Sequence, residues 1–224
     1  MVHTSASLIR SKVSATSEKT GSIRQKRGAG MSRQRTFGEY RAIDLTLLGI
    51  MLIIFESIIY AAATKLFPAE PYSVLLVASI TAIVLMRWGI FGAIHAALGG
   101  IVYCVLSHGT FQHYLVYVIG NLFALFALIL FKFWSKEDVR LDALKSVAFA
   151  LLVQLLMQLG RCVVSIALGS SFMQGLAFFT TDVISDLFTV VIIWIARRLD
   201  GVFEDQKHYL IRIQKETEKD KGTY

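Results

Sequence analysis

The sequence predicts an all-α integral membrane protein with six transmembrane helices and both termini in the cytoplasm. High apolar content, separate apolar stretches and a one-sided distribution of basic residues lead to this prediction. Hydrophobic residues make up 55% of the 224 residues, with only two prolines and a mean hydropathy of +0.59. Soluble domains of this size are less apolar, so we expect a membrane protein.

Six apolar stretches come close to the roughly 20 residues that a helix needs to cross a bilayer. They cover residues 43–63, 72–86, 89–106, 115–131, 146–168 and 176–196, and the second is the shortest. Unpaired backbone groups are too costly in lipid for open strands or loops, so each stretch is expected to be a helix.

The Lys and Arg residues set the expected orientation. Nine basic residues precede the first helix, Arg87 lies between the second and third, four lie in 132–145 and seven follow the sixth. Lys65 lies on the opposite side and Arg161 within the fifth helix. The positive-inside rule therefore predicts cytoplasmic termini in a multi-pass protein of the cell membrane, with a bacterial plasma membrane as the expected location. The basic tail also suits anionic membrane lipids, whereas nucleic-acid binding is not expected.

The chain divides into three predicted parts. Residues 1–40 form a basic cytoplasmic tail whose polar composition is typical of disorder. Residues 41–198 form the six-helix transmembrane domain, and residues 199–224 an amphipathic, charged cytoplasmic tail. The apolar positions of this last tail recur at helical spacing, so it is either a solvated continuation of the sixth helix or a docking surface for a cytoplasmic partner. Three short loops, residues 64–71, 107–114 and 169–175, are expected on the outer side.

The third helix carries small residues every fourth position. One series is Gly92, Ala96 and Gly100, and a second is Gly89, Ala93 and Ala97. Small residues let membrane helices approach closely, either within the chain or against another subunit. The two cysteines, Cys104 and Cys162, match no disulfide or zinc pattern and are expected to be packing residues; no metal site or cofactor is predicted.

A polar stripe crosses the fifth helix at Gln154, Gln158, Arg161 and Ser165. A charge in hydrocarbon costs several kcal/mol unless it has a partner, so Arg161 marks a functional-site hypothesis. Asp182 on the next helix is the expected ion-pair partner.

Four helices contribute polar residues at a similar depth. Glu56, Asn121, Arg161 and Asp182 each lie six or seven residues from the outer end, or about 10 Å at the helical rise. Gln158 and Asp186 complete the predicted substrate-binding set. The three carboxylates exceed the single Arg161 by two formal charges, which a cationic ligand or a protonated carboxylate would balance; the alternative is a purely structural ion pair.

Aromatic and histidine side chains gather near the same outer end of the predicted helices. They are Tyr60, Tyr103, His108, His113 and Tyr114. Their position is typical of the interfacial belt of membrane proteins, with contact to a ligand as the alternative.

The glycines at 89, 92, 99 and 100, together with the YVIGN sequence at 117–121, resemble the substrate-binding S components of energy-coupling factor transporters. The resemblance covers roughly residues 40–198. It implies a protein that binds a vitamin-like small molecule at its outer side and depends on a transmembrane coupling subunit and two cytoplasmic ATPase subunits. The family's AxxxA motif on the first helix is replaced here by Ser57 and Ala61.

Two alternatives remain open. The chain could be a structural or assembly protein of the cell envelope whose tail recruits cytoplasmic partners. It could also be an intramembrane enzyme that uses Asp182 and Asp186 near His95, because paired carboxylates can share a proton and activate water. No HExxH or GxSxG signature supports the second alternative, so no catalytic residue and no enzymatic activity are predicted.

Overall fold

The computed structural model describes residues 36–66 and 74–221, and these ranges are helical without any strand. The predicted tail over residues 1–35 and part of the predicted loop 64–71 lie outside the described residues. The chain divides into two compact units, residues 1–40 and 41–224. The first is described from Thr36, where the Thr36 and Glu39 side chains accept hydrogen bonds from each other's backbone N–H and start helix α2.

The described elements follow one another through short turns. They are α2 (Phe37–Leu66), α3 (Val77–Trp88), η1 (Gly89–Phe91), α4 (Gly92–Leu106), α5 (Phe111–Asn121), η2 (Leu122–Lys132), α6 (Lys136–Leu141), α7 (Ala143–Ala167), α8 (Phe172–Thr181), α9 (Val183–Ala196) and α10 (Gln206–Lys221), where η marks a 3₁₀-helix.

Several of these helices are long and apolar enough to cross a membrane. Four continuous segments qualify, residues 37–66, 77–106, 111–132 and 143–167, and α8 with α9 forms a fifth that is bent by 40°. The chain is thus all-helical, with four to five candidate spans suited to a multi-pass membrane protein.

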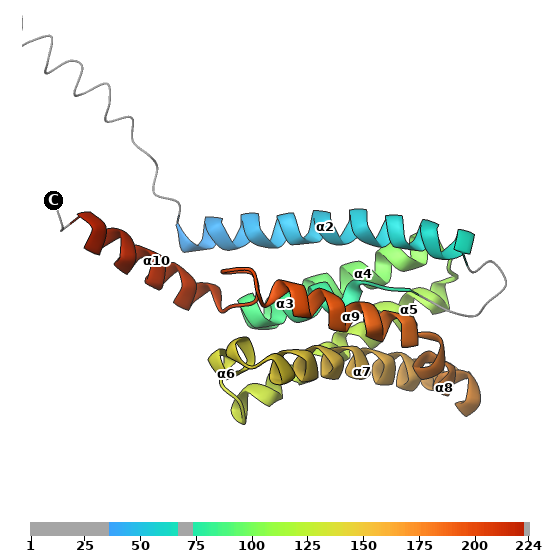
Figure 1. The fold of residues 1–224 in the computed structure, drawn as a ribbon. Helices are drawn as coiled ribbons and strands as arrows, with labels where there is room; N and C mark the ends of the chain where they lie inside the picture. The colour runs from blue at the N-terminus through green and yellow to red at the C-terminus, as the bar shows by residue number, and fades with distance from the viewer. Residues whose placement is uncertain (1–35, 67–73, 222–224) are drawn as a thin grey trace, which may run out of the picture. The chain divides into compact units, whose positions relative to one another are not determined.

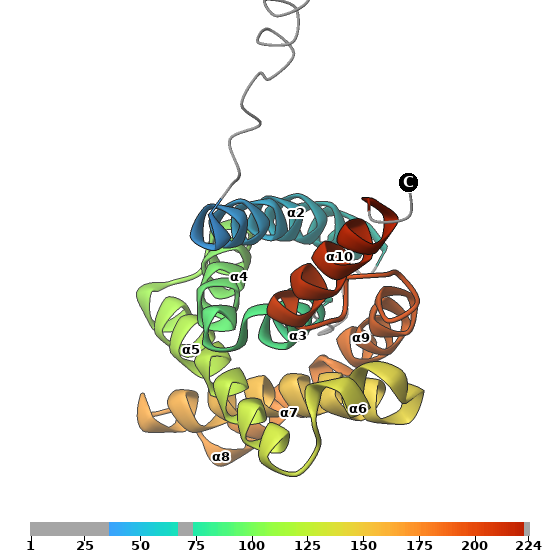
Figure 2. The same ribbon diagram turned by 90° about the vertical axis from the view of Figure 1, so that its left-hand side faces the viewer.

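Helix α3 forms the centre of the second unit. Every residue of α3 is buried, and Figure 2 shows it between α4, α7 and α9. The chain reverses at Gly89, whose φ is +59°, so that Gly92 lies against Leu85 and Gly99 against Val77. Candidate segment 77–106 is therefore an antiparallel pair of helices rather than one straight rod. The predicted stretch at 72–86 becomes helical only at Val77, because residues 74–76 are not helical.

The two ends of the second unit are named here by their glycine turns. The Gly89 end contains the α3–α4 turn, α6 and the chain between α9 and α10. The Gly109 end contains the α4–α5 turn and the α7–α8 turn (Figure 1). Its loops are shorter than the predicted 107–114 and 169–175, because α5 already starts at Phe111 and α8 at Phe172. The Thr110–His113 and Ser171–Gln174 capping boxes begin these helices early.

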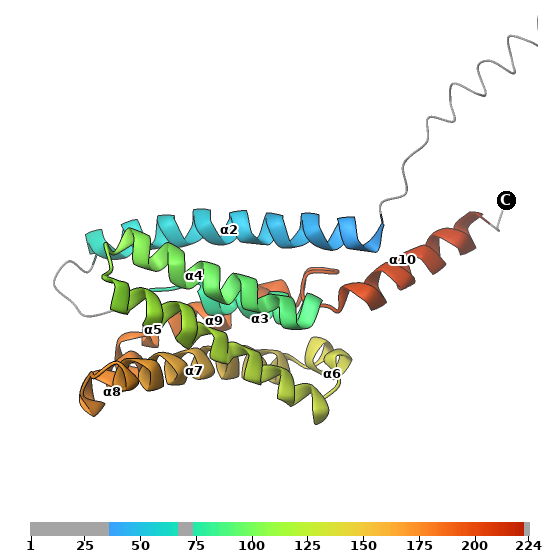
Figure 3. The ribbon, with the colours of Figure 1, turned by 180° about the vertical axis from the view of Figure 1, so that it is seen from behind.

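The small residues of α4 pack within the chain. Figure 3 shows α4 and α5 side by side, and Gly100 lies against the backbone of Tyr117. Gly92 and Ala96 are buried as well, so this series packs internally, one of the two predicted possibilities. On other parts of the same helix, Ile94 is 54% exposed.

The basic residues of the Gly89 end are ion-paired rather than merely topogenic. Arg87, placed in a turn by the sequence analysis, is only 9% exposed on α3 and binds both oxygens of Asp44, at 2.6 and 2.9 Å. It also donates to the carbonyl groups of Gly201 and Val202. Arg87 therefore connects α2, α3 and the chain before α10.

The C-terminal tail does not continue the sixth predicted helix directly. A turn with Gly201 at φ +69° separates α9 from α10, and α10 starts at Gln206 instead of residue 199. A side chain at Gly201 would overlap the Tyr209 ring. Lys136 holds this turn by bonding Asp205 at 2.6 Å and the Met86 carbonyl at 2.9 Å. The predicted amphipathic helix is present but shorter.

Candidate functional site

A buried ion pair links α7 to the junction of α8 and α9. Arg161 Nη1 lies 2.6 Å from Asp182 Oδ2, and the side chains are 2% and 0% exposed. The predicted pairing of Arg161 with Asp182 is therefore confirmed. Asp182 lies at the bend between α8 and α9 and accepts the backbone N–H of Asp186 with its own carbonyl.

Glu56 closes the start of α3. Its Oε2 atom accepts a hydrogen bond from the Leu76 backbone N–H at 2.8 Å, and the Ser185 hydroxyl accepts from the Leu75 N–H at 2.9 Å. The first N–H groups of a helix have no partner within the helix and carry partial positive charge. Glu56 on α2 and Ser185 on α9 therefore stabilise a helix that begins inside the protein.

Glu56 belongs to the same electrostatic cluster as the ion pair. The charges of both Arg161 and Asp182 act on the Glu56 carboxyl group, which is fully buried. Figure 2 shows that α2, α7 and α9 approach α3 from different sides. The structure thus unites three of the predicted site residues, Glu56, Arg161 and Asp182, at the buried start of α3.

Aromatic rings surround the Arg161 guanidinium. The Tyr103 and Tyr117 ring centroids are 4.4 Å apart, and Tyr60 and Phe178 extend the cluster at 6.1 and 6.0 Å. Arg161 lies over the Tyr117 ring at 5.3 Å, a cation–π distance. Tyr60 and Tyr103 therefore face the inside of the protein and not only an interfacial belt, whereas His108 is exposed and His113 caps α5.

Close backbone contact brings α5 to this cluster. A Cβ atom on Gly120 would lie 2.6 Å from the Arg161 backbone nitrogen, and one on Gly160 would lie 2.1 Å from the Gly120 carbonyl oxygen. Only glycine permits this approach. Each glycine directly precedes a polar residue, Asn121 or Arg161. Sequence reasoning missed Tyr117 and Gly160 as site-forming residues, although this Gly-polar pattern on both helices was a usable signal.

Three buried polar atoms around this region have no hydrogen-bond partner among the described residues. They are Glu56 Oε1, Asn121 Oδ1 and Arg161 Nε. Leaving a buried polar atom without a partner costs about 1–3 kcal/mol, so most such atoms are paired in folded proteins. Two acceptors and one donor are thus available to a polar group inside the protein.

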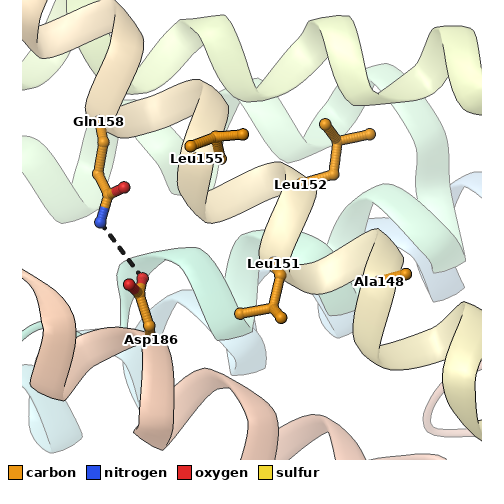
Figure 4. Close-up of a pocket in the computed structure, with 6 residues that line it drawn as sticks. All are labelled: Ala148, Leu151, Leu152, Leu155, Gln158 and Asp186. Atoms are coloured by element: carbon orange, nitrogen blue, oxygen red, sulfur yellow. Dashed lines mark hydrogen bonds between the residues drawn. The ribbon is translucent and has the colours of Figure 1, made fainter. Parts of the chain in front are cut away.

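The other predicted site residues do not join this cluster directly. Asn121 lies where α5 changes to η2, and its Nδ2 donates to the Ala96 carbonyl on α4 at 3.1 Å. Gln158 Nε2 donates to Asp186 Oδ1 at 3.2 Å, and both residues line a separate cavity of about 380 Å³ between α7 and α9 (Figure 4). The single predicted layer is therefore divided into a buried cluster and a lateral one.

The carboxylates and His95 have different partners. Asp182 pairs with Arg161, Asp186 with Gln158, and His95 Nε2 bonds the Leu45 carbonyl at 3.0 Å. Within residues 36–66 and 74–221, no group of three His, Cys, Asp or Glu side chains could hold a metal ion. Cys104 and Cys162 are buried, unbonded thiols, as expected of packing residues.

Comparison with known proteins adds no relative: no protein-family model, no curated protein and no solved structure matches the chain.

Proposed function

We propose that this chain is a membrane-embedded solute-recognition protein with six crossings and cytoplasmic termini. The crossings would be α2, residues 74–88, α4, α5 with η2, α7, and α8 with α9. An even number of crossings returns the chain to the side on which it started. The excess of basic residues at the Gly89 end favours that end as the cytoplasmic one.

The buried polar atoms at the start of α3 carry this proposal. Arg161 Nε can donate a hydrogen bond, while Glu56 Oε1 and Asn121 Oδ1 can accept one. A small polar molecule would satisfy groups that the protein itself leaves unpaired. Tyr60, Tyr103 and Tyr117 would supply its apolar contacts, because binding sites combine a few fixed polar groups with aromatic walls.

The proposed role is that of a subunit in a multisubunit importer. The likeness in the third and fourth predicted helices to S components of energy-coupling factor transporters supports this role. A vitamin-like ligand would enter from the Gly109 end, and a coupling subunit with two ATPase subunits would complete the importer. Copurification of ATPase subunits from native membranes is the expected result, whereas envelope-synthesis proteins would favour an assembly role.

Thermal unfolding of the full chain in nanodiscs with a panel of water-soluble vitamins tests the binding proposal. A compound at 100 times its Kd stabilises the folded state by about 2.7 kcal/mol. We expect one compound to raise Tm for the wild type and to lose that effect in Glu56→Gln and Tyr117→Phe. Glu56→Gln keeps an acceptor for Leu76, so its fold is expected to survive.

Arg198→Gln at the opposite end is the matched control, since Arg198 is exposed. It should respond like the wild type. Absence of stabilisation across the panel, or equal stabilisation of Glu56→Gln and Tyr117→Phe, would refute binding at the buried cluster.

A further inference from the structure

The lateral cavity between α7 and α9 is separate from the buried cluster and is not part of the proposed solute site. It has a volume of about 380 Å³ and is lined by Ala148, Leu151, Leu152, Leu155, Gln158 and Asp186. Figure 4 shows the α7 residues along one wall and Asp186 of α9 facing Gln158 at one end. Leu151 and Leu155 are 36% and 50% exposed, so the cavity opens to the outside of the helices.

Asp186 gives this apolar cavity a charged end. Its carboxylate is half-buried and accepts one hydrogen bond from Gln158, a neutral group. Among the residues that the structure describes, no Lys or Arg forms a salt bridge with Asp186, and Arg161 is paired with Asp182. The charge of Asp182 adds repulsion at Asp186.

A carboxylate at this position favours a positively charged partner. Ionised side chains within a membrane cost several kcal/mol unless they are paired or hydrated, and an ammonium group would supply the missing charge. The rest of the cavity wall is aliphatic and favours a hydrocarbon chain. Charge and lining together define an amphiphile with a cationic head.

The dimensions separate a hydrocarbon chain from a protein helix. From Ala148 to Gln158 the cavity follows about 15 Å of α7, and a helix with side chains is about 10 Å across, so a 15 Å length of helix occupies roughly 1,000 Å³. The cavity of about 380 Å³ is too small for that and suits a single extended chain.

We propose that this lateral cavity binds a membrane-partitioned long-chain amine, with its ammonium group on Asp186 and its hydrocarbon chain along Leu151, Leu152 and Leu155. Ligands of this class reach the cavity through the bilayer rather than through the Gly109 end. The site would therefore operate independently of the buried cluster.

Photolabelling of the full chain in phosphatidylcholine nanodiscs tests the proposal. The probe is dodecylamine with a diazirine on its chain, and the matched probes are the corresponding alcohol and carboxylate. We expect the amine to label peptides of α7 and α9, and the two matched probes to label them about tenfold less, the ratio that 1.4 kcal/mol of ion pairing gives.

Variants of the cavity distinguish its two parts. Asp186→Asn should reduce amine labelling about tenfold, and Asp186→Glu should retain it because the charge remains. Leu155→Trp should block the aliphatic part, while Leu159→Trp, on the same helix but not lining the cavity, is the matched control. Both leucines are partly exposed, so the larger ring need not disturb the interior.

Three outcomes would overturn the proposal: equal labelling by the alcohol probe, unchanged labelling of Asp186→Asn, or labelling confined to other helices. Glu56→Gln should leave amine labelling unchanged. A failure of vitamin binding together with intact amine labelling would refute the proposed solute site alone, and the reverse result would refute the lateral site alone.

Discussion

The Glu56 carboxylate on α2 accepts the backbone N–H of Leu76, and this bond fixes the point at which α3 begins inside the protein. Helix α2 has a narrow buried stripe of Gly49, Leu52 and Glu56. The contact with Leu76 thus combines a role in the fold with a place in the candidate site.

Replacing Glu56 by leucine should destabilise the protein more than replacing it by glutamine. Leucine leaves the Leu76 N–H without an acceptor at a buried position, which costs about 1–3 kcal/mol. Glutamine keeps an acceptor oxygen and should cost less. Thermal unfolding of the purified variants measures the difference, and equal stabilities would contradict the assigned role of the Leu76 bond.

Arg161→Ala should destabilise strongly because Asp182 then stays buried without its cation. Breaking one side of a buried ion pair costs about 3–5 kcal/mol. The double variant Arg161→Met with Asp182→Leu removes both charges and should recover much of that loss. A double-mutant cycle by denaturant unfolding measures the coupling, and strictly additive losses would show that the pair contributes nothing as a unit.

Gly160→Ala should separate α5 from α7. The added methyl group would lie 2.1 Å from the Gly120 carbonyl oxygen, a position that the backbone cannot vacate easily. Overpacking of this kind typically costs about 1–3 kcal/mol. Gly49→Ala is the matched control, because its nearest neighbour is the Leu98 side chain at 3.5 Å. Tm should fall for Gly160→Ala and stay nearly unchanged for Gly49→Ala.

The contact between Lys136 and Asp205 should make the Gly89 end sensitive to acid. Burial raises the pKa of the Asp205 carboxyl group, but Lys136 and the N–H groups of Lys207 and His208 lower it more, so the net pKa lies below its usual value. A lowered folded-state pKa contributes stability above the unfolded pKa of about 4, and this contribution is lost as pH falls through the folded pKa.

Asp205→Asn should therefore cost up to about 1 kcal/mol at neutral pH, a magnitude typical of partly exposed ion pairs. The difference from the wild type should disappear below about pH 3. Thermal unfolding across pH measures it, with exposed Glu216→Gln as the control. A constant difference at all pH values would exclude a titrating contribution of Asp205.

Local signals predicted much of the helical structure. Apolar length placed most helices because the cost of unpaired backbone in lipid depends only on local composition. Ser171, Ser135 and Asp142 mark helix starts by capping, a contact over two or three residues. The Arg161–Asp182 pair was also predictable, because one short turn joins their helices and brings the two charges level.

Other site features depend on long-range contacts that no local pattern contains. The non-helical start before Val77 exists because Glu56 and Ser185, from distant helices, satisfy its N–H groups. Asp186 was predicted beside Asp182 in one layer, yet its position across from Gln158 places it on the lateral cavity. Helical spacing gives the face of a residue but not the neighbour that this face meets.

The sequence by itself determined an apolar, all-helical chain, because composition and backbone pairing in lipid act residue by residue. Only the tertiary structure decided that α3 is enclosed on all sides and that its buried start meets Glu56 and the Arg161–Asp182 pair. The physical reason is close approach: Gly120 and Gly160 let two backbones touch, and a contact of that kind exists only once the helices have packed.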